Sequence, residues 1–280
     1  MDKLELKKLK LIATEIRKDI VDIVYNAQSG HPGGSLSCAD ILTVLYFRQM
    51  RIREKQPKWE DRDRFVLSKG HCSPALYATL ARRGFFDLDD LKTFRKTESH
   101  LEGHPNMNYV KGVDMSTGSL GQGISVACGM ALAGKIDKKD YRVYSIIGDG
   151  EIEEGQVWEA LMSAAHYKLD NLTIFLDNNG LQIDGKIDEV MSPNPIDEKF
   201  KAFGLNVINI DGNDIEQIDD AINKAKSIKG RPTVIVAKTT KGKGVSFMEN
   251  QVGWHGKAPN EEQRDIAISE LNKILSSLEE

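Results

Sequence analysis

An acidic stretch, GDGEIEEG at residues 148–155, directly follows an apolar run from Val143 to Ile147. A buried carboxylate is unfavourable unless a positive group meets it, so Asp149 should face solvent, a helix N-terminus or a bound cation. The next β-like run, LTIFLD, ends at Asp177, Asn178 and Asn179. One βαβ unit separates Asp149 from Asn179, which places them at equivalent ends of consecutive parallel strands.

One carboxylate, one amide oxygen and nearby backbone carbonyls suit Mg²⁺ or Ca²⁺ when the phosphate oxygens of a ligand complete the coordination shell. Taken singly, Asp149 is equally well explained as a helix cap, and Asn179 as part of an Asn-Gly turn. Their spacing favours a metal-bound phosphate ligand. Gly150 allows close backbone approach, and a helix starting near Glu154 offers amide groups and a positive dipole end.

The remaining carboxylates and glycines of this region carry weaker signals. We expect Glu151 and Glu153 to line a solvated helix start, and spacing alone assigns no role to Glu154 and Glu159. The segment GSLGQG at residues 118–123 precedes an alanine- and glycine-rich helical run. It departs from the GxGxxG motif and follows no clear strand, so it is only weak evidence for a dinucleotide-binding site. It could still let backbone atoms approach a flat or anionic ligand.

Four of the six histidines lie in glycine- or proline-rich turns: SGHPGG, SKGHC, EGHPN and GWHGK, which hold His31, His71, His104 and His255. They lack HxxxH or HxH spacing, which argues against a zinc site. Histidine titrates near neutrality and serves proton transfer and hydrogen bonding to hydroxyls or phosphates. The four turns therefore favour a polar, oxygen-rich substrate. His166 falls within a helical pattern and is expected to be structural or exposed, while His100 could go either way.

The order of elements predicts an α/β fold in which a parallel sheet has helices on both faces. The first 25 or so residues, with Ile12, Ile16, Ile20 and Val24 on one face, predict an amphipathic helix that ends at the irregular segment 29–34. Further helices are predicted at 39–49, 124–134, 154–169, 199–204, 214–228 and 260–279, and strands at 64–68, 142–147, 172–177, 205–210 and 233–239. No repeat or composition break occurs, so residues 1–280 are expected to form one domain. The long irregular stretches 97–120 and 240–259 contain glycine-flanked histidines and are expected to be functional loops.

Composition excludes several classes of function. With 40% hydrophobic and 29% charged residues, the 280-residue chain is typical of a soluble globular protein. A net charge of −4 gives no support to nucleic-acid binding or a membrane-surface role. No apolar run is long enough to span a bilayer, and the N-terminus lacks the features of a signal peptide. The three cysteines, Cys38, Cys72 and Cys128, form no CxxC pair, so we expect a reduced, cytoplasmic setting.

Taken together, these stretches resemble transketolase. The segments SGHPGG, DRFVLSKGHCSPALYA, GHP, TGSLGQG, GDGEIEEGQVWEA, LDNNGLQIDG, KTTKGKG and WHGKAP follow that family in order over nearly all of the chain. The pair GDG and NN is shared by the wider thiamine diphosphate superfamily, and the histidine turns narrow the resemblance. It implies the thiamine diphosphate-binding fold, with thiamine diphosphate and Mg²⁺, or another divalent cation such as Ca²⁺ or Mn²⁺, as cofactors. Asp149 would then meet the cation.

The resemblance also assigns roles to individual residues. Metal ligation would come from Asp149, Asn179 and the carbonyl of Leu181. Contacts to the diphosphate would come from Gly150, His71 and His255, with Lys241 close by.

The other end of the cofactor would be held by the backbone of Gly118 and Leu120, at the aminopyrimidine ring. Glu154 and Glu159 would join a carboxylate relay that reaches toward this ring from the neighbouring subunit. The residues expected to surround the reactive carbon, bond ketose hydroxyls and move protons are His31, His71, His104 and His255. One departure from the pattern is Gly34, where some family members carry a hydroxyl residue.

The resemblance implies transfer of a two-carbon ketol unit from a ketose phosphate to an aldose phosphate, in the non-oxidative pentose phosphate pathway. Family members usually continue into a pyrimidine-binding domain that this sequence lacks. We therefore expect the N-terminal subunit of a split transketolase, ending naturally after the helix 260–279 and joined to a C-terminal partner chain in an α2β2 assembly. The alternatives are a split enzyme for another sugar, a subunit of a 1-deoxyxylulose-5-phosphate synthase or 2-oxo acid dehydrogenase, and a non-catalytic binding module.

Overall fold

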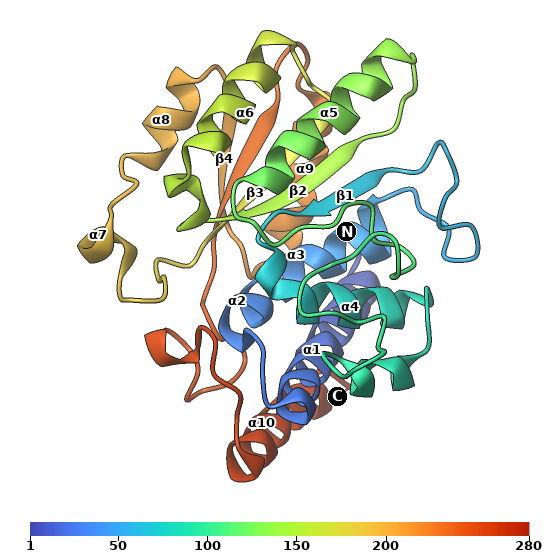
Figure 1. Ribbon diagram of the computed structural model, residues 1–280, viewed down its shortest axis with the longest axis vertical. Helices are drawn as coiled ribbons and strands as arrows, with labels where there is room; N and C mark the ends of the chain where they lie inside the picture. Colours follow the sequence, from blue (N-terminus) through green and yellow to red (C-terminus); the bar gives the residue numbers. More distant parts are fainter. Residues whose placement is uncertain (280) are drawn as a thin grey trace.

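A five-stranded parallel sheet forms the centre of the computed structural model, which describes residues 1–279 (Figure 1). The strand order is β1-β2-β3-β5-β4, and every neighbouring pair is parallel. The α/β prediction is therefore confirmed. The strands are β1 (Arg64–Leu67), β2 (Val143–Gly148), β3 (Leu172–Asn178), β4 (Asn206–Asp211) and β5 (Thr233–Lys238).

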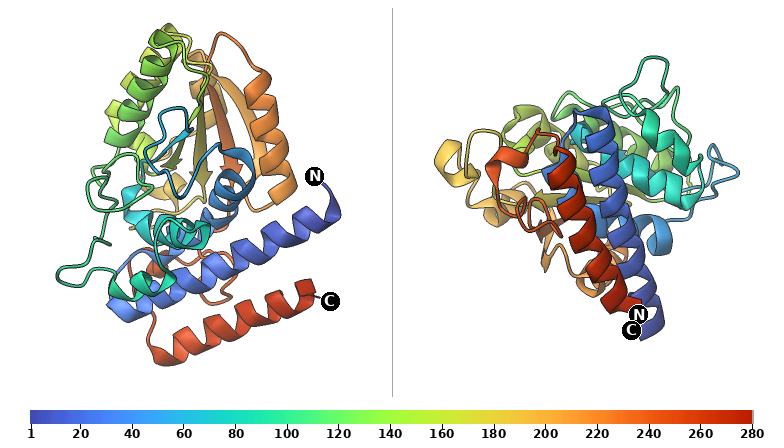
Figure 2. Two further views of the ribbon diagram at one scale, coloured as in Figure 1. Left: turned by 90° about the vertical axis from the view of Figure 1, so that its right-hand side faces the viewer. Right: turned by 90° about the horizontal axis from the view of Figure 1, so that it is seen from below.

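Helices cover both faces of the sheet, so its central strands are apolar on both sides. Along β2, Val143 and Ile147 pack into one hydrophobic cluster while Tyr144 and Ile146 pack into the other. The first cluster is covered by α5 (Gln122–Ile136), α6 (Gly155–His166) and α8 (Ile196–Ala202). The second is covered by α1 (Lys3–Ala27), α3 (Ala39–Val44), α4 (Ser73–Arg83) and α9 (Ile215–Ser227). Figure 2 shows α5 and α9 on opposite sides of the strands.

The C-terminal helix α10 (Glu261–Glu279) packs along α1, outside the two layers that cover the sheet (Figure 2). Lys7 Nζ donates a hydrogen bond to the carbonyl of Glu279 at 2.9 Å, so the two ends of the described chain lie side by side. No helix in residues 1–279 is both long and apolar enough to cross a membrane.

One local prediction is wrong. The segment SGHPGG was expected to be irregular, yet α2 (Pro32–Ser37) begins inside it. Pro32 occupies the first helical position, where its missing amide and fixed φ are well tolerated. Gly33 is required by tertiary packing, because a Cβ there would lie 2.8 Å from the carbonyl of Trp254. The turn is thus a short helix pressed against the loop that carries His255.

Candidate active site

The carboxyl ends of β1, β2, β3 and β5 surround a cavity of about 260 Å³. Loops that are far apart in the sequence line it, and they bring together most of the residues that the sequence predicts to act. Those that line the cavity are His31, His71, Gly118, Leu120, Asp149, Gly150, Asn179, Leu181, Lys241 and His255. His104, Glu154 and Glu159 do not line it.

Asp149 follows β2 and is only 3% exposed. Its carboxylate accepts hydrogen bonds from the backbone amides of Gly150 at 2.9 Å and Gly180 at 2.5 Å. Burial, followed by the negative charge of Asp177, raises the pKa of Asp149 to about 7. A carboxylate in such surroundings gains more from a bound cation than an exposed one would.

Asn179 and Leu181 supply further oxygens at the same edge of the sheet. The amide of Leu181 donates to Asn179 Oδ1 at 3.2 Å, which fixes the turn that presents the Leu181 carbonyl. With Asp149 these oxygens form the kind of hard donor set that Mg²⁺ prefers. Within residues 1–279 no three His, Cys, Asp or Glu side chains form a metal-binding group, so ligand oxygens would have to complete the shell.

A buried ion pair lies directly beneath the cavity, between Lys69 after β1 and Asp177 near the end of β3. The two side chains are 2% and 0% exposed, and Lys69 Nζ also donates to the carbonyl of Gly34 at 2.8 Å. Asp177 additionally accepts hydrogen bonds from Ser37 Oγ, at 2.6 Å, and from Thr239 Oγ1. Although burial opposes it, the charge of Lys69 together with these donors lowers the pKa of Asp177. Sequence analysis missed this pair, because its partners are distant in the chain.

Three of the four predicted histidines form one cluster. The ring centroids of His31 and His71 are 5.1 Å apart, and that of His255 lies 5.4 Å from each. Burial is the main cause that lowers their pKa values, to about 4 for His31 and His71 and about 3 for His255. They are therefore neutral near pH 7 and can both donate and accept hydrogen bonds.

Lys241 joins the histidine cluster to the edge of the cavity that carries Leu181. Its Nζ lies 2.9 Å from His255 Nδ1 and donates to the carbonyl of Leu181 at 3.0 Å. Burial lowers the pKa of Lys241. His31 Nδ1 is buried without a hydrogen-bond partner among the described residues.

His104 lies outside the cluster and is exposed. Its ring packs against Gly118, where a Cβ would come within 3.0 Å of it. The hydroxyl of Tyr77 donates to the His104 carbonyl at 2.9 Å and so anchors the turn. His104 therefore stands next to the cavity on the far side of Gly118.

The glutamates after β2 divide differently from the sequence prediction. Glu153 is exposed, as predicted for a solvated helix start, but Glu151, for which the same was predicted, is buried. Glu154 and Glu159, to which spacing assigned no role, are exposed. The prediction for Glu151 is wrong because Ser68, Gly121 and Gly148 supply hydrogen bonds that replace water. Burial raises the pKa of Glu151, and these donors oppose the shift. No local sequence signal identifies these partners. His166 is exposed, in agreement with the prediction that it is structural or exposed.

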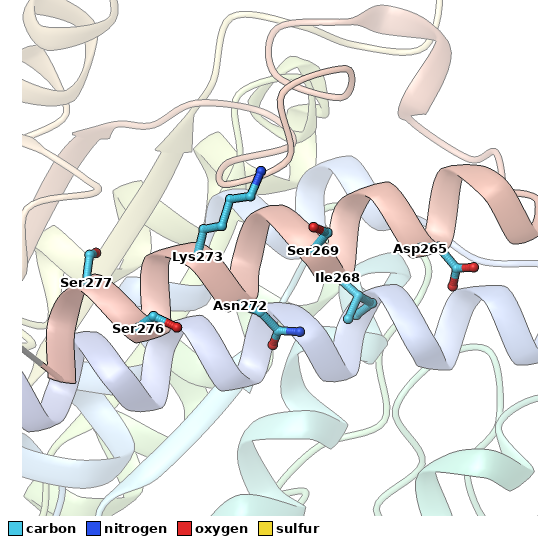
Figure 3. A pocket seen from close by; sticks show the side chains of 7 residues that line it. All are labelled: Asp265, Ile268, Ser269, Asn272, Lys273, Ser276 and Ser277. Atoms are coloured by element: carbon cyan, nitrogen blue, oxygen red, sulfur yellow. The ribbon is translucent and has the colours of Figure 1, made fainter.

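A second hollow, of about 630 Å³, runs along α10 and has no comparable chemistry. As Figure 3 shows, Ser269, Lys273 and Ser277 point to one side of the helix and Asp265, Ile268 and Asn272 to the other. Because these side chains converge on no common point, the cavity at the strand ends is the better candidate for an active site.

A family model described as "Transketolase, thiamine diphosphate binding domain" matches residues 8–272. Over 99% of its length, the chain is 43% identical to one subunit of the apulose-4-phosphate transketolase of Phocaeicola vulgatus, of which it covers 98%. It is 45% identical to a 6-deoxy-6-sulfo-D-fructose transketolase subunit of a Clostridium species, covering 93% of this chain and 95% of that one.

Longer relatives match over part of their length only. Human transketolase is 41% identical over 99% of this chain, which spans 44% of the human protein. The crystal structure of transketolase from Campylobacter jejuni superposes with a TM-score of 0.90 at 36% identity, covering 97% of this chain and 43% of that one. The chain thus spans less than half the length of these two proteins.

The ion pair beneath the cavity yields a stability prediction. We expect Lys69→Met to lower the free energy of unfolding by about 3–5 kcal/mol, because it leaves the Asp177 carboxylate buried without its counter-charge. Adding Asp177→Asn should recover part of the loss, since the uncompensated charge is then removed. Lys238→Met, at an exposed lysine near the end of β5, should change stability by less than about 0.5 kcal/mol. Urea unfolding of the four proteins measures these differences, and equal stability of Lys69→Met and the wild type would contradict the prediction.

Proposed function

The chain belongs to the transketolase family, as its thiamine diphosphate-binding part, and on that premise we propose that it is the N-terminal subunit of a two-chain transketolase. The observation that supports this proposal most directly is the match to relatives that are named as transketolase subunits, along nearly their whole length. The chain covers 98% and 95% of two relatives that are named as transketolase subunits, but only 44% of human transketolase. Residues 1–280 would act as one domain, paired with a separate pyrimidine-binding chain in an α2β2 assembly.

The proposed reaction moves a two-carbon ketol unit from a ketose phosphate to an aldose phosphate. Bound thiamine diphosphate supplies the carbon nucleophile for this transfer. Mg²⁺ would be held by Asp149, Asn179 and the Leu181 carbonyl, whose oxygens already lie at one edge of the cavity. The positive charge of Mg²⁺ would offset the negative charge of the buried Asp149 and attract the diphosphate oxygens.

The other residues around the cavity would position the cofactor and handle protons. Gly150, His71, His255 and Lys241 would bind the diphosphate. The neutral histidines His31, His71 and His255, with His104 on the far side of Gly118, would hydrogen-bond the sugar hydroxyls and exchange protons with them.

The rim of the cavity fits a site that a second chain completes. Leu120 and Ile183 line it yet are 37% and 67% exposed. Glu154 and Glu159 are exposed nearby, where a relay to a neighbouring subunit would have to begin. A partner chain would cover the apolar rim and the aminopyrimidine ring, which Gly118 and Leu120 would hold from this side.

Two substrate classes follow from the relatives. Xylulose 5-phosphate and ribose 5-phosphate, the pair expected for the non-oxidative pentose phosphate pathway, form the first. A modified sugar is the second, because two relatives that match over 98% and 95% of their length are named for apulose 4-phosphate and 6-deoxy-6-sulfo-D-fructose. Assaying the assembled enzyme with each donor separates them.

The metal site can be tested through cofactor binding. We expect Asp149→Ala to weaken Mg²⁺-dependent binding of thiamine diphosphate by more than about 100-fold, since it removes a direct ligand and even outer-shell changes cost 10–100-fold. Asp184→Ala, at an exposed carboxylate in the following loop, is the matched control and should bind normally. Calorimetry that gives Asp149→Ala the wild-type affinity would remove the proposed metal site.

His104 should act on substrate and leave cofactor binding alone, because it lies outside the cavity lining. We expect His104→Ala to lower kcat/KM for the ketose donor by roughly 10- to 1000-fold through loss of one polar contact. Thiamine diphosphate affinity should be unchanged, and His166→Ala, on the exposed end of α6, should alter neither quantity. Loss of cofactor binding in His104→Ala would show that the assignment is wrong.

The split arrangement predicts that the purified chain alone transfers no ketol units. Its cavity is open at the rim, so water would reach the aminopyrimidine end and the activating carboxylic acid of the partner would be missing. Adding the pyrimidine-binding chain should restore activity at a ratio near one to one. A coupled ketol-transfer assay with sedimentation analysis measures both effects. Robust transfer by the rigorously purified single chain would contradict the proposal.

A further inference from the structure

Glu151 is a buried carboxylate that none of the roles above uses. It begins the short turn after β2, and its exposed fraction is 2%. Its Oε1 accepts hydrogen bonds from Ser68 Oγ at 2.5 Å and from the amide of Gly121 at 2.9 Å. Its Oε2 accepts from the amide of Gly148 at 3.0 Å. Three donors from three separate segments therefore converge on one side chain.

Two of these segments meet at the start of α5. The residue before this helix, Gly121, has no side chain to cap the free amides of the first turn. Glu151 accepts from the Gly121 amide, and Ser68 Oγ accepts from the amide of Ile124 at 3.1 Å. Glu151 and Ser68 thus cap α5 from outside the helix. A carboxylate at this end is also favoured by the helix dipole.

Close packing leaves the capped segment little freedom. A Cβ at Gly123 would lie 2.8 Å from the Cα of Ser68, and one at Gly70 would lie 2.7 Å from the amide nitrogen of Gly118. Gly121 has a φ of +80°, and a Cβ there would lie 3.0 Å from that of Glu154. The segment from Gly118 to Gly121 is therefore held between the turn after β1 and the turn after β2.

We propose that Glu151, together with Ser68, is a positioning residue that fixes the segment 118–121 where its backbone meets the aminopyrimidine ring of thiamine diphosphate. The inference rests on the proposed function, because that function assigns Gly118 and Leu120 to this ring. Gly118 and Leu120 line the cavity and are joined to α5 through Gly121. Loss of the Glu151 bonds should let the segment shift. Gly148, which also donates to Glu151, stays paired with Asp177 in the sheet. Asp149 keeps its bonds from Gly150 and Gly180, so the diphosphate end should keep its place.

A purely structural role for Glu151 would have different consequences. If Glu151 only stabilised the fold, its loss would lower the stability of the protein and would weaken binding at both ends of the cofactor alike. A positioning role should weaken thiamine diphosphate but leave inorganic diphosphate, which has no pyrimidine ring, bound as before. Comparing these two ligands in the presence of Mg²⁺ therefore separates the roles.

The experiment uses the full chain with Glu151→Leu, Ser68→Ala and the control Glu153→Leu. The control changes an exposed carboxylate of the same turn in the same way. Leucine is close to Glu151 in size but accepts no hydrogen bond, whereas glutamine would keep one oxygen that can still face Ser68 and Gly121. Hydrogen exchange should accelerate by roughly 10-fold or more at the Gly121 amide in Glu151→Leu and at the Ile124 amide in Ser68→Ala, because each amide then loses its acceptor. Calorimetric affinity for thiamine diphosphate should fall roughly 10- to 100-fold, with that for inorganic diphosphate unchanged.

Each alternative result has a distinct meaning. If Glu151→Leu has the same Gly121 exchange rate and the same thiamine diphosphate affinity as Glu153→Leu, the proposal is overturned. Equal weakening of both ligands would reject positioning, because the change would then act on the diphosphate end as well. A wild-type chain that binds neither ligand would contradict the proposed function instead, and the exchange rates of the apo chain would then decide alone whether Glu151 holds this segment.

Discussion

The buried ion pair between Lys69 and Asp177 is the interaction on which the candidate site depends. Asp177 is fully buried near the end of β3, and its hydrogen-bond donors come from α2, from the turn after β1 and from the residues after β5. One carboxylate therefore holds four segments at the carboxyl edge of the sheet. Because these donors come from different parts of the chain, the cavity above Asp177 requires that the ends of β1, β3 and β5 and the helix α2 come together.

The same pair sets the electrostatics of the cavity. The charge of Asp177 contributes to the raised pKa of Asp149, and the charge of Lys69 contributes to the lowered pKa of His71, in each case after burial itself. The edge near Asp149 therefore favours a bound cation, while the histidine cluster stays neutral. Under the proposed function these are the conditions that a metal-bound diphosphate and a set of proton-exchanging histidines require.

Sequence patterns predicted what depends on local order. The apolar runs that form β2, β3 and β5 are buried on both faces. Strands of this kind appear in the sequence as uninterrupted apolar segments, so they can be predicted from it. Asp149 and Asn179 could be paired because parallel strands end at one edge. Glu151 and the Lys69–Asp177 pair could not, since their partners come from distant segments whose approach no local spacing encodes. The helix α2 was missed for the same reason: the contact that requires Gly33 is with the carbonyl of Trp254, far along the chain.

The two ends of the cavity differ in how completely this chain builds them. At the end proposed for the diphosphate, Asp149 and Lys241 are buried, and the Leu181 carbonyl is hydrogen-bonded within the chain. At the opposite end Leu120 and Ile183 are exposed, and Glu151 holds only the backbone of the loop that carries Leu120. Proton transfer between weak acids and bases is efficient where water is excluded and geometry is fixed. Under the proposed function, the chain would fix one end of the cofactor and leave the other open, so a second surface would be needed there. The division of a transketolase into two chains would place the boundary at this rim.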